Sequence, residues 1–173
     1  VTGVQTCALP ICSTIAVTSS VSTTGYASVT GSTQSDTFNV TLTGPGTVSV
    51  SAIDGVGGSD DFNVTLSGTT ASQTQTVSLG TLSGGTGNDT FDVSFAGDGT
   101  HSITANIEGG TGDNTYNLVG AVTLTGNITG GAGVDELTLD EGAQITGFYD
   151  GGDASYTGAT VDGGTQNYLS FNG

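Results

Sequence analysis

The stretch GGTGNDTFDVSFAG, residues 84 to 97, decides the fold, because the rest of the chain repeats it with variations. A glycine-rich turn ends at Asp89 and leads into a segment in which Phe91, Val93 and Phe95 alternate with polar residues. Alternation with a period of two places one set of side chains in a core and the other in water, as in a β-strand. Glycine permits backbone angles that other residues resist, so the chain can turn sharply before this strand. The repeating unit is therefore a turn followed by a strand.

Related copies precede and follow this stretch. They are GSTQSDTFNVTLTG (31–44), GVGGSDDFNVTLSG (55–68), GGTGDNTYNLVG (109–120) and GGAGVDELTLDEG (130–142). Between copies lies a second strand-like segment, and its last apolar residue stands two places before the next glycine pair. These apolar residues are Leu82, Ile107, Ile128, Tyr149 and Val161. Two short strands and two turns that recur every twenty-odd residues indicate a solenoid, in which each repeat stacks on its neighbours.

The sequence therefore predicts an all-β fold, a β-solenoid of the parallel β-helix or β-roll kind with coils of about 21–25 residues. In such a stack Phe38, Phe62 and Phe91 are expected in register, one above another. The step from Phe62 to Phe91 is longer, at 29 residues, and predicts a surface loop within 69–83. The alternative is an antiparallel β-sandwich, which short alternating strands with frequent turns also fit. A sandwich would scatter the three phenylalanines over two opposed sheets.

The charge balance limits the partners of this chain. It has 16 Asp and Glu residues, one His and neither Lys nor Arg, which gives a formal net charge of −16. Nucleic acid and anionic membrane surfaces are excluded as partners, because both require basic groups. No apolar run is long enough to predict insertion into a membrane. Acidic turns stacked on one another would repel, unless metal ions, salt or backbone N–H groups compensate.

Residues 1–12, VTGVQTCALPIC, differ from the rest of the chain. They hold both cysteines and lack the threonine and glycine character that follows, and they resemble the translation of a common sequencing-library adapter. We interpret them as a non-native, adapter-derived segment and leave them out of the fold prediction. The alternative is a genuine N-terminal strand with a Cys7–Cys12 disulfide. Residues 13–173 are interpreted as a single repeat domain without cysteine and as a fragment of a longer protein.

The core GGTGNDTFD at 84–92 matches the nonapeptide GGxGxDxUx, in which U is a large apolar residue, and the cores at 109–117 and 130–138 are similar to it. They resemble the RTX (haemolysin-type) repeats of secreted bacterial proteins. The string TGNITGGAGVDELTL (125–139) also resembles bacterial strand-repeat surface proteins, which include adhesins and S-layer-like proteins. The RTX resemblance implies calcium, held between stacked turns by aspartate carboxylates and glycine-region carbonyls. Carried over by position, the aspartate slot falls on Asp89, Asn114 and Asp135, with Asp60 and Asp36 in degraded copies. The metal candidates are Asp60, Asp89, Asn114 and Asp135, together with Asp113, which is adjacent to Asn114.

The chain also departs from the RTX pattern. RTX arrays repeat every nine residues, so that both sides of a coil carry a turn, whereas here one side carries it. Asn114 replaces an aspartate, and the adjacent Asp113 is a candidate substitute. The alternative is that the glycines and Asx residues serve turn geometry alone, with Asp and Asn side chains bonded to nearby backbone.

Other candidate sites carry weaker patterns. Four Asn-x-Ser/Thr sequons mark the glycosylation candidates Asn39, Asn63, Asn88 and Asn127. His101 is the one imidazole and is expected to be solvated near a turn tip, whereas Ser–His–Asp catalysis needs a positioned base. Aspartates of neighbouring turns would meet the carboxylate spacing of a glycosidase by architecture alone. We therefore predict that the chain is not an enzyme.

Three functional hypotheses follow. The first is a structural, non-catalytic segment of a secreted bacterial surface or filament protein, extracellular and self-associating into a fibre or layer. The alternative is a calcium-dependent, RTX-like folding or adhesion module that folds on export. The third is a carbohydrate-binding or carbohydrate-cleaving β-helix, which predicts a cleft with exposed aromatic residues.

Overall fold

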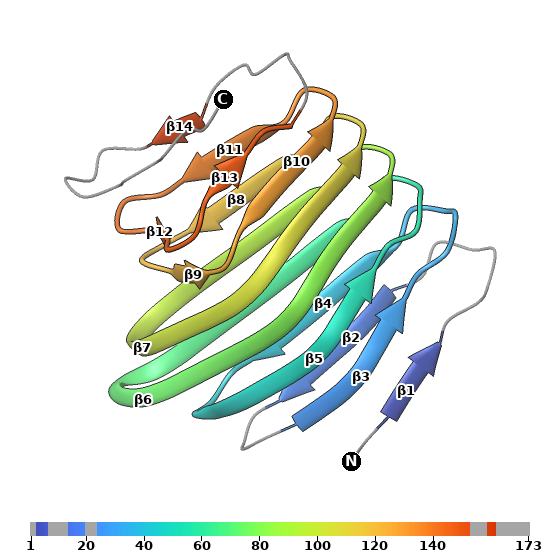
Figure 1. Ribbon diagram of the computed structural model, residues 1–173. Helices are drawn as coiled ribbons and strands as arrows, with labels where there is room; N and C mark the ends of the chain where they lie inside the picture. Colours follow the sequence, from blue (N-terminus) through green and yellow to red (C-terminus); the bar gives the residue numbers. More distant parts are fainter. Residues whose placement is uncertain (1–2, 7–13, 20–23, 153–158, 162–173) are drawn as a thin grey trace.

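The computed structural model describes residues 3–6, 14–19, 24–152 and 159–161 (Figure 1). This part of the chain is all-β and winds into a β-solenoid of about 5 turns. Every pair of neighbouring strands in it is parallel, so the predicted solenoid is confirmed and the antiparallel sandwich is wrong. Within these residues we find no helix with the length and apolar character needed to cross a membrane.

Each coil contributes a strand to a first sheet, bends, and contributes a second strand to a facing sheet (Figure 1). The first sheet contains β2 (Thr14–Ser19), β4 (Thr37–Leu42), the beginning of β6 (Asp61–Thr86), the beginning of β7 (Thr90–Thr111), β8 (Thr115–Val119), β11 (Glu136–Leu139) and β14 (Ala159–Val161). The second contains β1 (Gly3–Thr6), β3 (Thr24–Thr30), β5 (Gly46–Asp54), the ends of β6 and β7, β9 (Thr123–Thr125), β10 (Ile128–Ala132), β12 (Gln144–Ile145) and β13 (Tyr149–Asp150). Because β6 and β7 continue through their bends, both sheets are joined.

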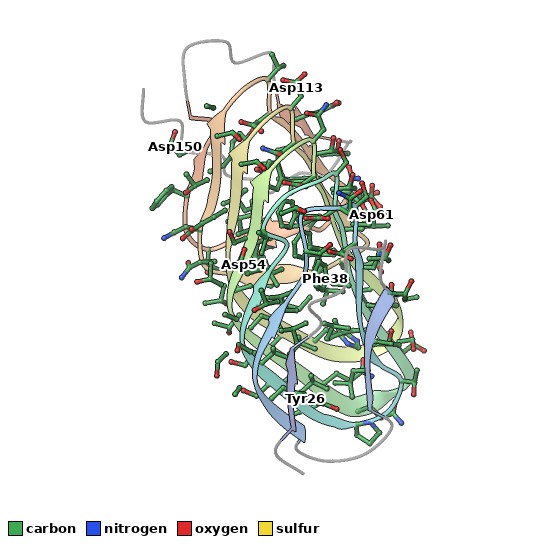
Figure 2. The ribbon with its side chains drawn as sticks, turned by 90° about the vertical axis from the view of Figure 1, so that its right-hand side faces the viewer. Tyr26, Phe38, Asp54, Asp61, Asp113 and Asp150 are labelled. Carbon is green, nitrogen blue, oxygen red and sulfur yellow. The ribbon has the colours of Figure 1, made fainter. Side chains whose placement is uncertain are left out.

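An aromatic stack runs through the core along the first sheet. Phe38 pairs in register with Phe62, Phe62 with Phe91 and Phe91 with Tyr116. The ring centroids of successive pairs lie 4.8, 4.6 and 5.2 Å apart, with interplanar angles of 17°, 10° and 9°. The predicted register of the three phenylalanines is therefore confirmed, and Figure 2 shows Phe38 between the two sheets.

The facing sheet supplies the other half of the core in equally regular rows. One row pairs Leu82 with Ile107 and Ile107 with Ile128, which in turn pairs with Tyr149. Successive side chains on each strand alternate between this core and solvent, as the burial of β4 shows. The core is therefore a column of like residues on like residues, built one coil at a time.

The long coil between Phe62 and Phe91 places its extra residues at two points. Thr69 and Thr74 are five positions apart, whereas their partners Asp98 and Thr100 are two apart. A second shift, between Ser78 and Thr81, adds one further residue. The predicted surface loop over 69–83 was therefore too broad, because most of the return is a paired strand.

The last glycine pair does not continue the row of apolar residues. Val161 pairs with Leu139 in the first sheet, instead of joining the row of Tyr149 in the second. The step of 12 residues between the glycine pairs at 151 and 163 is about half a coil, so it moves the strand to the opposite sheet. The Cys7–Cys12 disulfide lies outside the described residues, although β1, within the segment 1–12, pairs with β3.

Val56 is the one described non-glycine residue with a positive φ, at 77°. It stands where the other turns have Gly85, Gly110 and Gly131, whose φ values are 94°, 98° and 104°. A β-branched residue is strained in this region, because its Cβ crowds the following carbonyl.

Replacing Val56 by glycine is expected to raise the free energy of unfolding by about 0.5–1 kcal/mol, since relief of strain exceeds the added entropy of the unfolded chain. Urea denaturation measures the change. Val134 has the same exposed fraction, 38%, but no positive φ, so Val134→Gly is expected to destabilise the fold. Equal effects of the two substitutions would contradict the strain at Val56.

Candidate functional site

Five side chains at the glycine turns form a buried row, one per coil, which we call the Asx row. Each residue ends a turn and directly precedes a strand of the first sheet. Each is at most 2% exposed, although four are acidic. The members are Asp36, Asp60, Asp89, Asn114 and Asp135.

The Oδ1 atoms of the Asx row join each coil to the next. The backbone N–H of Asp36 donates to Asp60 Oδ1 at 2.7 Å, and that of Asp60 to Asp89 Oδ1 at 2.8 Å. Asp89 donates in the same way to Asn114 Oδ1 at 3.0 Å, and Asn114 to Asp135 Oδ1 at 3.0 Å. The carboxyl of one coil therefore satisfies a buried backbone donor of the preceding coil, which would otherwise have no partner.

The second polar atom of each side chain has one of three environments. Asp36 Oδ2 accepts from the backbone N–H of Ser32 at 2.7 Å and from its hydroxyl at 3.0 Å. Asn114 Nδ2 donates to the carbonyl of Gly112 at 3.2 Å. The Oδ2 atoms of the remaining three members are fully buried and have no hydrogen-bond partner among the described residues; these members are Asp60, Asp89 and Asp135.

The first glycine of each pair makes room for the Asx row. A Cβ added at Gly84 would collide with Asp89 Oδ2 and lie 2.6 Å from the carbonyl oxygen of Gly109 in the next coil. The equivalent Cβ at Gly55 would collide with Asp60 Oδ2 and lie 2.8 Å from Gly84 O. Each Oδ2 atom without a hydrogen-bond partner, which we call an orphaned oxygen, therefore lies against the first glycine of a pair. A carbonyl oxygen of the next coil lies against the same glycine, so no other residue fits there.

The surroundings disfavour negative charge in the Asx row. Burial raises the pKa of Asp60 to about 7, with an opposing effect from the Asp36 N–H and a smaller increase from nearby carboxylates. Burial likewise raises the pKa of Asp89 and of Asp135. The sequence has no Lys or Arg that would offset these effects. The three carboxyls with orphaned Oδ2 atoms therefore hold protons more tightly than ordinary aspartates do.

Asp113 lies outside the Asx row. It is exposed, and its Oδ1 accepts from the backbone N–H of Val134 at 2.8 Å, while its own N–H donates to Asn88 Oδ1 at 3.1 Å. Figure 2 shows it on the outside of the turns. Neighbouring residues in an extended segment point to opposite sides, so Asp113 does not stand in for Asn114.

The Asx row does not fit the calcium ion that the RTX resemblance implies. Calcium takes six to eight oxygen ligands. Here the Oδ1 atoms of four members accept backbone hydrogen bonds, namely Asp60, Asp89, Asn114 and Asp135, and the three Oδ2 atoms without a partner are buried beside the glycine turns. Among the described residues, no three acidic, His or Cys side chains converge on one point. Three coils each offer one carboxylate oxygen without a hydrogen-bond partner among the described residues, and together with the glycine carbonyl beside it this is fewer than six ligands.

The four glycosylation candidates lie on the outside of the coils. Asn39 and Asn63 are half-buried on the first sheet, where Asn63 Nδ2 donates to Asn39 Oδ1 at 3.1 Å. Asn88 is exposed, and Asn127 Oδ1 accepts from the N–H of Phe148 at 3.2 Å. Modification of these asparagines stays a prediction.

His101 is not solvated as expected. Its ring stacks on Phe95 with centroids 3.5 Å apart, and both ring nitrogens are buried without a hydrogen-bond partner among the described residues. Burial lowers the pKa of His101, which keeps the ring neutral. It lies near the bend opposite the glycine turns, remote from the Asx row.

Gln75 is a buried polar residue that the sequence reading missed. Its Nε2 donates to the carbonyls of Leu42 at 3.0 Å, Gly44 at 2.9 Å and Ser67 at 3.2 Å. These carbonyls lie where neighbouring coils bend, so Gln75 fastens two bends together. No signal in the surrounding Thr- and Ser-rich run distinguishes it.

Comparison of the chain with protein-family models, curated proteins and solved structures found no match. The candidate site is therefore interpreted from its own residues.

Proposed function

We propose that this chain is a structural, non-catalytic segment of a secreted bacterial surface or filament protein, exposed outside the cell. The observation that carries the proposal is the in-register stacking of like residues from coil to coil, in both the aromatic stack and the Asx row. Each coil presents the same groups to both neighbours, so further coils can be added to the stack through the same contacts. This is the property that a spacer or filament needs.

The arrangement of outer charges supports the same proposal. On the second sheet one exposed row alternates acid with hydroxyl, in the order Asp54, Ser83, Glu108, Thr129 and Asp150. Like charges directly opposite each other on neighbouring strands are destabilising, and this alternation separates them by two strand spacings. Asp54 and Asp150 both lie on the outside of this sheet (Figure 2). This spacing reduces the repulsion between carboxylates along a long, strongly acidic stack of coils.

Self-association is proposed to occur end to end. Among the described strands outside the segment 1–12, β2 pairs on one side only at one end of the stack, as do β13 and β14 at the other. A strand with one unpaired edge is a template for another strand. A second copy of the chain, continuing the coils, is the partner that matches these edges.

Electron microscopy and sedimentation over a range of protein concentrations test this proposal. At low salt the net charge of −16 opposes association, so rods that lengthen with protein concentration and with ionic strength are expected. Amide groups on a strand alternate in direction, and Thr160, opposite Thr138, points its N–H back to β11, so the N–H of Ala159 is the one that points to the unpaired edge of β14. Ala159→Pro removes this edge N–H and is expected to shorten the rods. Monomers at every concentration and salt level would contradict self-association.

The calcium-dependent module and the carbohydrate-binding β-helix stay hypotheses from the sequence. No contact described above favours either of them over the structural role.

A further inference from the structure

Asn114 shows what the buried end of an Asx-row side chain can do. Its Oδ1 accepts the N–H of Asp89, which leaves Nδ2 as the atom that faces the turn. Nδ2 donates to the carbonyl of Gly112 and also lies near the carbonyl of Gly130, since a Cβ on Gly109 would be 2.6 Å from both Nδ2 and Gly130 O. In this coil the atoms around the end of the side chain include two carbonyl acceptors, and the side chain presents a donor to them.

In three other coils the same place holds a carboxyl oxygen. Asp89 Oδ2 and the carbonyl oxygen of Gly109 both lie beside Gly84, as Asp60 Oδ2 and Gly84 O both lie beside Gly55, and neither carboxyl oxygen has a hydrogen-bond partner among the described residues. An ionised oxygen there would be a buried charge next to a carbonyl lone pair, which is strongly unfavourable. A protonated carboxyl has one O–H donor and keeps an acceptor oxygen, so it matches the hydrogen-bonding pattern of Asn114.

We infer that Asp60, Asp89 and Asp135 are neutral carboxylic acids in the folded protein, each donating its Oδ2–H to backbone carbonyls of the glycine turn. The Asx row is then a proton-binding site that links coil stacking to pH, and not the cation site that the sequence motif implies. This inference is independent of the proposed structural role.

Asp36 provides the contrasting case in the same row. Its Oδ2 faces two donors, the N–H and hydroxyl of Ser32, at 2.7 and 3.0 Å. Because this oxygen already has donors, the inference covers Asp60, Asp89 and Asp135 and not the row as a whole.

The groups packed around the three acids are acidic, phenolic or neutral. Asp61 adds negative charge near Asp60 and Asp89, and Asp113 does so near Asp135. Tyr149 donates its hydroxyl to the backbone carbonyl of Asp135 at 3.3 Å, and Tyr116 donates to that of Thr129 at 3.5 Å. The remaining neighbours are the other row members, Asp36 and Asn114; the backbone and the side chain of Asn114 hydrogen-bond to Asp135 and lower its pKa, although burial has the larger, opposite effect. No cation among the described residues opposes protonation.

The direction of the pH effect follows from linkage. A carboxyl whose pKa is higher in the folded than in the unfolded chain binds more protons when folded. For Asp60 the pKa rises from 3.8 to about 7, so its stabilising effect is complete below pH 3.8 and is lost as the pH rises through about 7. Folding is therefore favoured by mild acid, opposite to the usual effect of a salt-bridged aspartate.

The test compares urea unfolding of the full chain and its variants at pH 4.5 and pH 8, without and with added calcium chloride. Asp60→Asn reproduces the Asn114 pattern and is expected to raise the folding equilibrium constant by roughly tenfold or more at pH 8, with a much smaller change at pH 4.5. Asp36→Asn places an amide donor against the donors of Ser32 and is expected to lower the folding equilibrium constant at pH 8. Asp98→Asn, at an exposed position outside the row, controls for net charge.

The reverse substitution is a second test. Asn114→Asp is expected to steepen the loss of stability between pH 4.5 and pH 8, whereas Gln144→Glu, at an exposed position, adds the same charge without that effect. Infrared spectra of the unaltered protein at pH 6 are expected to contain the C=O band of protonated carboxylic acids, weakened in Asp60→Asn.

Two results would overturn the inference. One is a pH dependence of Asp60→Asn equal to that of Asp98→Asn, with no protonated carboxyl band in the unaltered protein. The other is a calcium-induced stabilisation at pH 8 that Asp60→Asn abolishes, which would make the row a cation site. The infrared measurement decides the question even if a variant fails to fold.

Discussion

Replacing Phe91 by alanine is expected to lower the free energy of unfolding by about 3–5 kcal/mol. Phe91 is fully buried and lies in the middle of the aromatic stack, with ring centroids 4.6 Å from Phe62 and 5.2 Å from Tyr116. The substitution removes both ring contacts and leaves a cavity. The backbones of three consecutive coils are paired across this point, so they cannot close in to fill it.

Denaturant unfolding at pH 4.5, where we expect Asp60, Asp89 and Asp135 to be protonated, measures this loss with little contribution from the titration of these acids. Phe148→Ala is the matched control, because Phe148 is 43% exposed, and its effect is expected within about 0.5 kcal/mol. A loss below about 1 kcal/mol in Phe91→Ala would mean that the backbone ladders, and not the stacked rings, hold the coils together.

Replacing Gly84 by alanine is expected to destabilise the fold by about 3 kcal/mol or more. The new Cβ would collide with Asp89 Oδ2 and lie 2.6 Å from the backbone of the next coil at Gly109. Neither neighbour can move freely, because Asp89 Oδ1 accepts the N–H of Asp60 and the two coils are paired along their strands. The collision therefore separates the turns or breaks the Asx row.

Gly25→Ala is the control for this substitution, since a Cβ at Gly25 would have no atom within 4 Å. It is expected to be neutral or to stabilise the protein by about 0.5 kcal/mol, through the smaller entropy of its unfolded chain. Thermal or urea unfolding of both variants gives the comparison. Similar midpoints for the two would show that the turn at Gly84 can widen, contrary to its close packing.

Much of the fold could be predicted from the spacing of residues. The alternation around Phe38, Phe62 and Phe91 specifies which side chains are buried, and the repeated turns specify that equivalent strands stack in parallel. A register slip of one residue would turn the whole apolar set outward, so the pattern allows one alignment. The same spacing identified all five members of the Asx row, although not their burial.

Other features depend on contacts that spacing does not encode. The extra residues of the long coil were expected in one loop, yet they lie in two bulges, because pairing with β7 holds the rest of the return strand. Val161 stands two places before a glycine pair, as Tyr149 does, but it pairs with Leu139 in the first sheet and not in the second. Gln75 and the ring nitrogens of His101 are buried, and no local pattern marks either residue.

The sequence by itself determined the column of like residues, because periodic apolar positions and glycine turns leave one way to bury the core. Only the tertiary structure decided what the buried acids contact. The motif places an aspartate at the end of each turn, but its chemistry depends on whether the adjacent coil and turn offer donors, as at Ser32, or carbonyl oxygens, as at Gly109. Those partners lie across the stack, where charge and hydrogen bonding are set by three-dimensional proximity and not by position in the chain.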